Sequence, residues 1–600
     1  MTTAGAPPSL PAPSWPHCAR DADPTSDPVG CRGRQVEPYG SCLAHLTSAD
    51  RSTYLSSLSS GGALDHRGTL ISEDLLHQLL NALRDPATGR RYIDAAWFDG
   101  ATFHGEARFR GVTFSSYASF VGATFSGEAT FEEATFSNQA WFQQATFSGH
   151  ASFDEATFAD YVSFDRATFS QYAIFSRVTF SGDAVFGEAT FSDHASFTRT
   201  DFSGLAWFDD VTFSGEVQSR GVTFSGDAWF DGVTFENASQ LGPLICQGAL
   251  VLSGARFVNS VIIAAAATRL ECQQTRWNST AALWLRRATV NLRDAVFEYP
   301  VSITARTAPF EVTGAASAER DVVGSDPAVC IESVRGADAA HLVLHNVDLR
   351  GCLLSGAVHL DQLRLEGEFP LAPTPSGLRL RGLLPMRWTV RRTVAEEQHW
   401  RAAQGWTGWT AAPAGVEVVG PAQLAPVYRQ LRKSFEDSKN EPDSADFYYG
   451  EMEMRRHDHK RPRAERTLLA VYWAVSGYGL RASRALGWLL SAMAATVLIM
   501  MLWGLPQADP KPTTSGRLNG QDISLTTDKP APGNPTGSLH SRLTSERWEK
   551  SLRIVVNSVV FRSSGQDLTT TGTYTEMASR LAEPVLLGLA ALAIRGRVKR

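Results

Sequence analysis

The 600-residue sequence is poor in cysteine and lacks the short motifs that commonly mark an enzyme. Its seven cysteines form no tight disulfide framework, so we expect the protein to lie in a reducing compartment. The N-terminal stretch, 1–40, is polar and proline-rich and contains no apolar signal-peptide core, so this part is expected to stay in the cytosol. No P-loop, Gly-x-Ser-x-Gly or His-Glu-x-x-His motif occurs. We therefore predict a non-catalytic protein.

One stretch imitates a dinucleotide-binding turn but lacks its setting. Val471-Tyr-Trp-Ala-Val475 precedes Gly477-Tyr-Gly479-Leu-Arg-Ala482, which follows the spacing of a strand and a glycine-rich turn. No βαβ unit surrounds it, and an apolar run stands where the acidic partner is needed. We expect no dinucleotide cofactor.

Phenylalanine is concentrated in one segment. Of the 32 phenylalanines, 25 lie between Phe98 and Phe235. They alternate spacings of five and six residues, which gives an 11-residue period with 26 slots, of which Ser219 alone is not phenylalanine. Two residues before each slot stands Ala, Val or, once, Thr200. The unit is Ala-x-Phe followed by two or three polar residues.

This unit predicts very short strands rather than helices. Spacings of five and six do not keep one face of a helix at 3.6 residues per turn, whereas Ala-x-Phe directs both outer residues to one side of a strand. So short a strand cannot bury its phenylalanine alone. Coils stacked at about 4.8 Å bury it between them.

The repeat resembles the pentapeptide-repeat family, whose right-handed coils have four faces of about five residues. The resemblance implies a mainly β, right-handed β-solenoid with the phenylalanine pointing inward. Its coils would have about 22 residues, with an extra residue at two of the four corners. The structural core would include Phe103, Phe109, Phe114, Phe120, Phe125, Phe131, Phe136, Phe142, Phe147, Phe153, Phe158, Phe164 and Phe169.

A weaker form of the pattern continues toward residue 370. Spaced apolar triplets such as Ala295-Val-Phe297 persist, residues 304–338 interrupt them, and Asn346-Val-Asp-Leu-Arg350 resumes a five-residue period with leucine. Before the repeat, residues 72–83 predict a helix, N-capped by Ser72 and carrying one leucine stripe. We expect this helix to cap the solenoid.

Three cysteines and one histidine near the N-terminus are a candidate metal site. Cys42 and His45 have a tight two-ligand spacing, and Cys18 and Cys31 complete a set that suits tetrahedral zinc. The alternative is three free cytosolic thiols, because the other spacings are not diagnostic. Zinc is thus the one cofactor that the sequence leaves open.

The C-terminal part contains a predicted membrane span. Residues 485–505 carry no charge and are long enough to cross a bilayer, with Trp488 and Trp503 near the ends. Basic residues from Arg455 to Arg466 precede the span and favour a cytoplasmic flank; a buried soluble helix is the alternative.

A second membrane segment is predicted at 581–600. Only 11 uncharged residues lie between Pro584 and Ile594, with Glu583 before them and a basic tail after. Two spans would leave 506–580 as a polar external loop. This layout has a faint similarity to two-helix ion channels, with 551–561 as the half-helix and 569–574 as the filter loop.

A helical hairpin is predicted between solenoid and membrane. Leu424 to Phe435 mark its first helix, Asn440 begins the break, and Ala445 to Met452 mark the second helix. We interpret its charged residues, among them Glu451, as a solvated face.

The predicted domains follow from these features. They are an N-terminal Cys/His segment (1–60), a helical cap (61–94), the solenoid (95–370), a linker with the hairpin (371–465), an interfacial segment and span (466–505), the external loop (506–580), and a short second segment with a basic tail (581–600).

Three functions remain open. The first is a non-catalytic scaffold or protein-interaction module that is anchored in the cell membrane with its solenoid on the cytoplasmic side. Its partners would be the lipid bilayer and an unidentified protein, and it could form a homo-oligomer. The second is a channel-like protein with the solenoid as sensor. The third is mimicry of DNA toward a nucleic-acid enzyme, since residues 95–240 hold 19 acidic and 6 basic residues; solubility of a long rod explains the same charge. We expect no direct binding of nucleic acid.

Overall fold

The computed structural model describes residues 12–23, 27–310, 328–381, 384–508, 510–519, 522–560 and 563–598. The chain divides into two compact units, Met1–Val418 and Val419–Arg600. Part of the predicted interruption at 304–338 lies outside the described residues, as do the first residues of the N-terminal segment and the last two of the basic tail.

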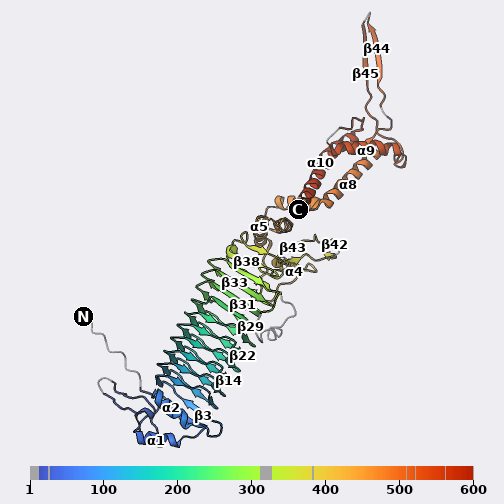
Figure 1. The fold of residues 1–600 in the computed structure, drawn as a ribbon. Coiled ribbons are helices and arrows are strands. Elements are labelled where there is room, and N and C mark those ends of the chain that lie inside the picture. Colours follow the sequence, from blue (N-terminus) through green and yellow to red (C-terminus); the bar gives the residue numbers. More distant parts are fainter. Residues whose placement is uncertain are drawn as a thin grey trace, which may run out of the picture. The chain divides into compact units, whose positions relative to one another are not determined.

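The first unit is a β-solenoid whose strands form four parallel ladders (Figure 1). Each strand pairs with the strand two periods further along the chain: Thr135 pairs with Thr157, and Ala151 pairs with Ala173. The predicted fold class and coil length are thereby confirmed. We number the ladders as faces 1 to 4 in the order in which the chain passes through them.

Face 1 contains β3 (Arg91–Trp97, which continues onto face 2), β6 (Val112–Phe114), β10 (Thr135–Phe136), β14 (Thr157–Phe158), β18 (Thr179–Phe180), β22 (Asp201–Phe202) and β26 (Val222–Phe224). Face 2 contains β7 (Ala118–Ser119), β11 (Ala140–Trp141), β15 (Val162–Ser163), β19 (Ala184–Val185), β23 (Ala206–Trp207), β27 (Ala228–Trp229), β34 (Thr289–Asn291) and β37 (Cys330–Ser333).

Face 3 contains β2 (Leu70–Ser72), β4 (Thr102–His104), β8 (Thr124–Phe125), β12 (Thr146–Phe147), β16 (Thr168–Phe169), β20 (Thr190–Phe191), β24 (Thr212–Phe213), β28 (Thr234–Phe235), β30 (Arg256–Phe257), β32 (Arg276–Trp277) and β35 (Val296–Phe297). Face 4 contains β5 (Ala107–Arg108), β9 (Ala129–Thr130), β13 (Ala151–Ser152), β17 (Ala173–Ile174), β21 (Ala195–Ser196) and β25 (Val217–Gln218). In later coils longer strands run around a corner or along one face: β29 (Gln240–Val251), β31 (Val261–Glu271), β33 (Ala281–Arg286), β36 (Val301–Ala305), β38 (Leu342–His345) and β39 (Arg364–Glu366).

The phenylalanines fill the interior. All thirteen named above are at most 1% exposed. Rings one coil apart stack, as in Phe125 with Phe147 at 4.7 Å and Phe131 with Phe153 at 4.9 Å between centroids. The stacking distance equals the strand spacing, so backbone pairing and ring packing reinforce each other.

Two kinds of corner alternate around each coil. Corners within a five-residue spacing hold a residue with positive φ, at every eleventh position from Gly100 through Arg199 to Gly232. Corners within a six-residue spacing bring successive coils into close backbone contact. A Cβ at Gly149 would lie 2.5 Å from the carbonyl group of Gly127, which explains the frequent glycine there.

In the coils that follow Phe257, up to Val301, the period is shorter by two residues. Arg256 pairs with Arg276, and Arg276 with Val296. The change occurs through register shifts between β29 and β31. The strict five-residue period is thus restored where aliphatic side chains replace most of the phenylalanines.

The solenoid begins earlier than the predicted boundary at residue 95. Strand β1 (Gly62–Asp65) pairs in parallel with β3, and β2 pairs with β4. Helix α2 (Glu73–Ala82) follows β2 and contacts β5, the first strand of face 4. Ser72 caps it by accepting a hydrogen bond from the Leu75 amide, as predicted. The helix is therefore an insertion in the first coil. Helix α1 (Ser48–Ser57) precedes β1.

The other end of this unit is ordered, although the sequence predicts a linker. Helix α4 (Ala395–Ala403) places Glu396, which is 1% exposed, where it accepts hydrogen bonds from the amides of Leu354 and Ser355 at 2.6 and 2.7 Å. Beside it, Glu397 pairs at 2.5 Å with both Arg391 and Arg401 in a buried network. Short strands complete the region: β40 (Ala372–Pro373), β41 (Leu378–Arg381), β42 (Leu384–Arg387) and β43 (Arg392–Thr393).

The second unit is helical. It contains α5 (Pro421–Asp437), α6 (Glu441–His457), α7 (Arg463–Ser476), α8 (Ala482–Ile499) with a π-helical turn (Met500–Gly504), the hairpin β44 (Thr513–Asn519) and β45 (Asp522–Asp528), α9 (Ser545–Val559) and α10 (Thr570–Val598). Helices α5 and α6 form the predicted hairpin, with Phe435 and Phe447 in contact at 4.9 Å between ring centroids. The interpretation of Glu451 as solvated is wrong. It is 2% exposed and bonds to Arg429 and Arg432 at 3.1 and 3.0 Å.

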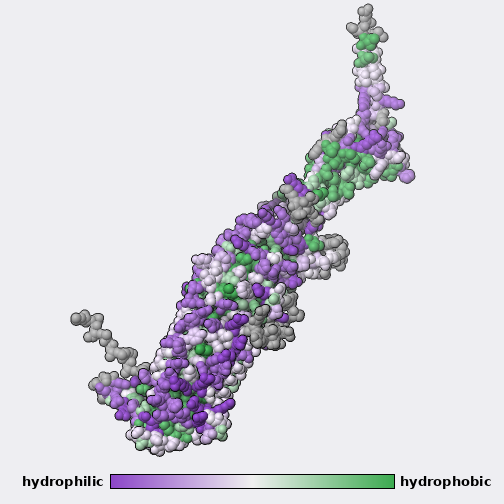
Figure 2. All heavy atoms as spheres, in the orientation of Figure 1, coloured by the Kyte–Doolittle hydropathy of each residue, from purple (hydrophilic) through white to green (hydrophobic). Residues whose placement is uncertain are grey.

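Two helices are long and apolar enough to cross a membrane, Ala482–Gly504 and Thr570–Arg595. Hydrophobic residues gather over α8 and α10 in Figure 2. The second helix starts well before the predicted segment at 581. The predicted filter loop at 569–574 is wrong, because α10 begins at Thr570. Glu583 lies within this helix, where its side chain is fully buried and accepts hydrogen bonds from the hydroxyls of Thr496 and Ser558.

Candidate metal centre

The residues before α1 fold into a compact loop that gathers the four candidate ligands. The amide of Cys18 donates to the carbonyl of Gly33, and that of Cys31 donates to the carbonyl of Arg20. Cys42 precedes a single helical turn, Leu43–His45, that turns His45 back toward it. Because of this turn, the side chains of Cys42 and His45 face each other although two residues separate them in the sequence.

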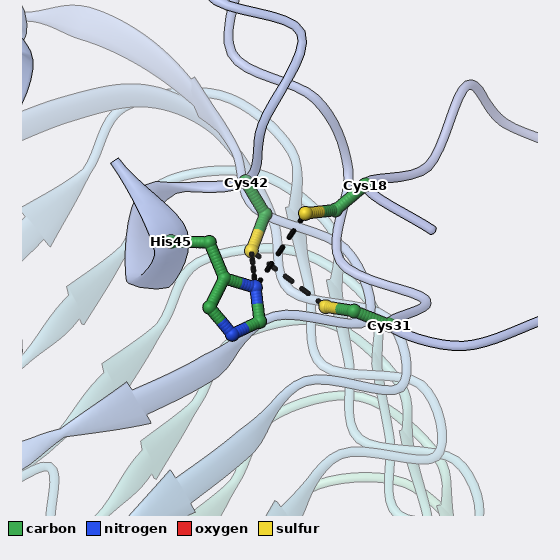
Figure 3. Close-up of side chains that lie close together, drawn as sticks. All are labelled: Cys18, Cys31, Cys42 and His45. Atoms are coloured by element: carbon green, nitrogen blue, oxygen red, sulfur yellow. Dashed lines mark hydrogen bonds between the residues drawn. The ribbon is translucent and has the colours of Figure 1, made fainter. Parts of the chain in front are cut away.

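The four side chains converge on one point (Figure 3). Nδ1 of His45 lies 3.5 Å from Sγ of Cys18 and 3.4 Å from Sγ of Cys42. The sulfurs of Cys31 and Cys42 are 3.8 Å apart. All four ligand atoms lie within 4.8 Å of one another. The group could hold a metal ion.

These separations fit a tetrahedral ion. With zinc–sulfur bonds of about 2.3 Å and a zinc–nitrogen bond of about 2.0 Å, a tetrahedron has edges of about 3.8 Å between sulfurs and about 3.5 Å between sulfur and nitrogen. The three separations given above agree with these edges. Three sulfurs and one imidazole nitrogen leave no position for water, which is typical of a structural site rather than a catalytic one.

The contact between the Cys31 and Cys42 thiols changes the pKa of both groups. The hydrogen bond from Cys42 lowers the pKa of the Cys31 thiol to about 5. The same interaction raises the pKa of Cys42, and burial adds to the rise. A lowered thiol pKa favours the thiolate, the form that binds metal.

Comparison with known proteins identifies the solenoid and leaves the metal centre without a counterpart. Residues 93–135, 131–179 and 175–218 match the family described as pentapeptide repeats (9 copies). The segment 93–218 therefore consists of pentapeptide repeats. No curated protein and no solved structure matches it.

The pentapeptide-repeat ladder extends past the matched residues in both directions, from β1 to β39. Its own cysteines differ from the N-terminal group. Burial raises the pKa of Cys246 and of Cys272 to about 12 in both cases, so they are inert core thiols. Among the residues that the structure describes, the N-terminal four are the one cluster of three or more Cys, His, Asp or Glu suited to a metal.

The Cys/His loop is attached to the first coil of the pentapeptide-repeat solenoid. The amide of Arg34 donates to the carbonyl of Arg67, and its guanidinium pairs with Asp65 at 2.7 Å. Arg67 pairs with the same carboxylate at 2.8 Å and lies 5.0 Å from the ring of Trp15. An ion at the cluster would thus brace the loop that covers the start of the solenoid.

Sequence reasoning missed two polar features. One is the buried Glu583, noted only as a cost to membrane insertion. The other is a line of arginines on face 4, at Arg177, Arg199 and Arg220. Arg177 and Arg199 lie 22 residues apart and Arg199 and Arg220 lie 21 residues apart, so the three stand on successive coils, and this near-regular spacing is the signal that could have found them.

Proposed function

We propose that this pentapeptide-repeat protein is a membrane-anchored, non-catalytic scaffold that presents its solenoid to a protein partner in the cytoplasm. The supporting observation is the combination, in one chain, of a rigid repeat domain and two helices able to cross a bilayer. A solenoid offers a long regular surface for binding, and a membrane anchor restricts where that surface acts.

The sidedness rests on the basic flanks. The Gly504 carbonyl lies against Gly572, so the end of α8 meets the start of α10 and the two helices run in opposite directions. The basic residues from Arg455 to Arg466 and those from Arg595 onward therefore belong to the same side. Positive flanks favour the cytoplasm.

A topology map tests the anchor. Reporter fusions after residues 380, 540 and 600, expressed in a bacterium, should place 380 and 600 in the cytoplasm and 540 outside. If 540 and 600 are found on the same side, α10 does not span the membrane and the two-span anchor is wrong.

We further propose that the Cys/His cluster binds zinc as a structural ion. Metal analysis of the purified full-length chain should find about one zinc per chain, and Cys42→Ser should lose it. The control is Cys246→Ser, which removes a solenoid thiol and should keep the metal. Zinc-free wild-type protein would favour the alternative of free thiols.

The channel-like alternative is favoured by one observation: α9 contacts both α8 and α10. A short helix against two spans is the arrangement expected of a pore helix. Ion flux into vesicles that contain the purified protein, compared with vesicles that contain Glu583→Leu, tests the idea. Absence of ion flux at high protein density would exclude the channel and favour the scaffold.

A further inference from the structure

Face 4 of the solenoid carries a hollow of about 620 Å³ that the proposed functions do not use. It lies over strands β17, β21 and β25. Small side chains make its floor, and long basic side chains stand along one edge. Such a recess on an otherwise regular rod calls for a chemical explanation.

The edge is built from arginines on three successive coils. The amide of Arg177 donates to the Thr198 carbonyl, and the amide of Arg199 donates to the Arg220 carbonyl, both at 2.9 Å. At about 4.8 Å per coil, the three arginines form a line about 10 Å long. They are half of the six basic residues between 95 and 240, where 19 residues are acidic. The lining of the hollow thus holds three arginines and one carboxylate, that of Asp154, against the acidic trend of the whole segment.

The arginines differ in their partners. Arg177 pairs with Asp154 at 2.5 Å and with Glu155 at 2.8 Å, which holds it at the N-terminal end of the hollow. Arg199 is exposed and makes no ion pair with any residue in the described part of the chain. Its guanidinium is available for an added anion.

The floor supplies hydroxyl groups. The hydroxyls of Ser176 and Ser196 are 2.9 Å apart, and those of Ser196 and Thr198 are 3.2 Å apart. Each hydroxyl can rotate its proton toward a ligand oxygen. The ring of Tyr172, 5.8 Å from that of His194, lines another part of the hollow.

We propose that this hollow binds a soluble anion with two or more linked phosphate groups, laid along the arginine line. Guanidinium groups match phosphate oxygens in paired hydrogen bonds, and hydroxyls complete the coordination. A single phosphate reaches only part of a line of this length, whereas an oligophosphate engages neighbouring coils.

Calorimetric titration of the full-length protein in detergent, at low salt, tests the proposal. Tripolyphosphate should bind at least tenfold more tightly than orthophosphate. Arg199→Gln should weaken tripolyphosphate binding tenfold or more. Arg166→Gln is the matched control, because Arg166 also occupies a positive-φ corner but pairs with Glu188 on the opposite side of the coil. It should bind as wild type does.

The outcomes are separable. Undetectable binding by wild type, or equal affinities for the Arg199→Gln and Arg166→Gln variants, would overturn the proposal. Arg220→Gln gives a second test if Arg199→Gln lowers the melting temperature. A nucleoside triphosphate titrated in parallel distinguishes the two sources of such an anion, because only the nucleotide can add contact with the Tyr172 ring. All of these readouts are independent of membrane topology and of zinc.

Discussion

The coils before Phe257 and those after it solve the same packing problem with different side chains. The earlier coils are two residues longer and stack phenylalanine on phenylalanine, whereas the later ones bury residues such as Ile263, Leu283 and Leu285. The longer coil has an extra residue at two corners, which widens the perimeter around the larger rings. Coil length and interior volume therefore change together, since close packing tolerates neither voids nor overlap.

The transition between the two kinds of coil is visible around Ser219. This residue takes a phenylalanine slot, and its hydroxyl accepts a hydrogen bond from the Gly242 amide at 2.9 Å. A cavity of about 40 Å³ lies beside it. Ring stacking thus begins to fail one to two coils before the register shifts.

The largest effect should come from breaking a ring stack. Phe164 is fully buried between Phe142 and Phe186, each 4.9 Å away between ring centroids. We expect Phe164→Ala to destabilise the solenoid by about 3–5 kcal/mol, because it removes a packed ring from the core. Chemical denaturation of the full-length protein in detergent measures it. A loss below about 1 kcal/mol would show that the rings do not carry the stability of the long coils.

A six-residue corner should be the next most sensitive place. Gly149→Ala would set a methyl group 2.5 Å from the backbone of Gly127, at a cost of about 1–3 kcal/mol. The control is Gly122→Ala at a corner of the other kind, where a Cβ meets nothing within 4 Å but φ is positive. We expect about 1 kcal/mol there, from backbone strain alone. Equal losses of stability at both corners would show that the close backbone contact at Gly149 adds nothing to the cost of the substitution.

The short coils should respond less to a small deletion. Ile263 is 1% exposed in an aliphatic interior. Ile263→Val removes one methylene, and we expect a loss of about 0.5–1.5 kcal/mol in the same denaturation experiment. A loss of stability as large as that of Phe164→Ala would contradict the proposed difference between the two kinds of coil.

The smallest effect is expected beside Phe164. The repeat predicts an outward Ser163, yet this residue is fully buried, and its hydroxyl accepts a weak hydrogen bond from the Asp165 amide at 3.3 Å. Ser163→Ala should cost less than about 1 kcal/mol. If its melting shift equals that of Phe164→Ala, the inward assignment of the phenylalanine is contradicted.

What depends on local repetition could be predicted from the sequence. Ala-x-Phe specifies both the strand and its buried face, so the coil length follows from spacing alone. The helix over 72–83 and the α5–α6 hairpin are predictable for the same reason, because their caps and apolar stripes are local.

Features that depend on distant contacts were not predictable. The start of the ladder at Gly62 requires pairing across an inserted helix. The burial of Glu396, Glu451 and Glu583 depends on partners from other elements, and acidic residues give no local sign of it. Cys18 and Cys31 were named as candidates, but their approach to Cys42 and His45 is set by loop hydrogen bonds that no spacing rule encodes.

The carboxylate of Glu396 has a consequence for how the rod meets other copies of itself. Every coil offers its amides to the next, so an uncovered last coil would accept a first coil from another molecule and grow into a filament. We expect Glu396, which occupies the Leu354 and Ser355 amides, to oppose such growth. Sedimentation of Glu396→Ala beside wild type would show this as a shift from discrete particles to polymer.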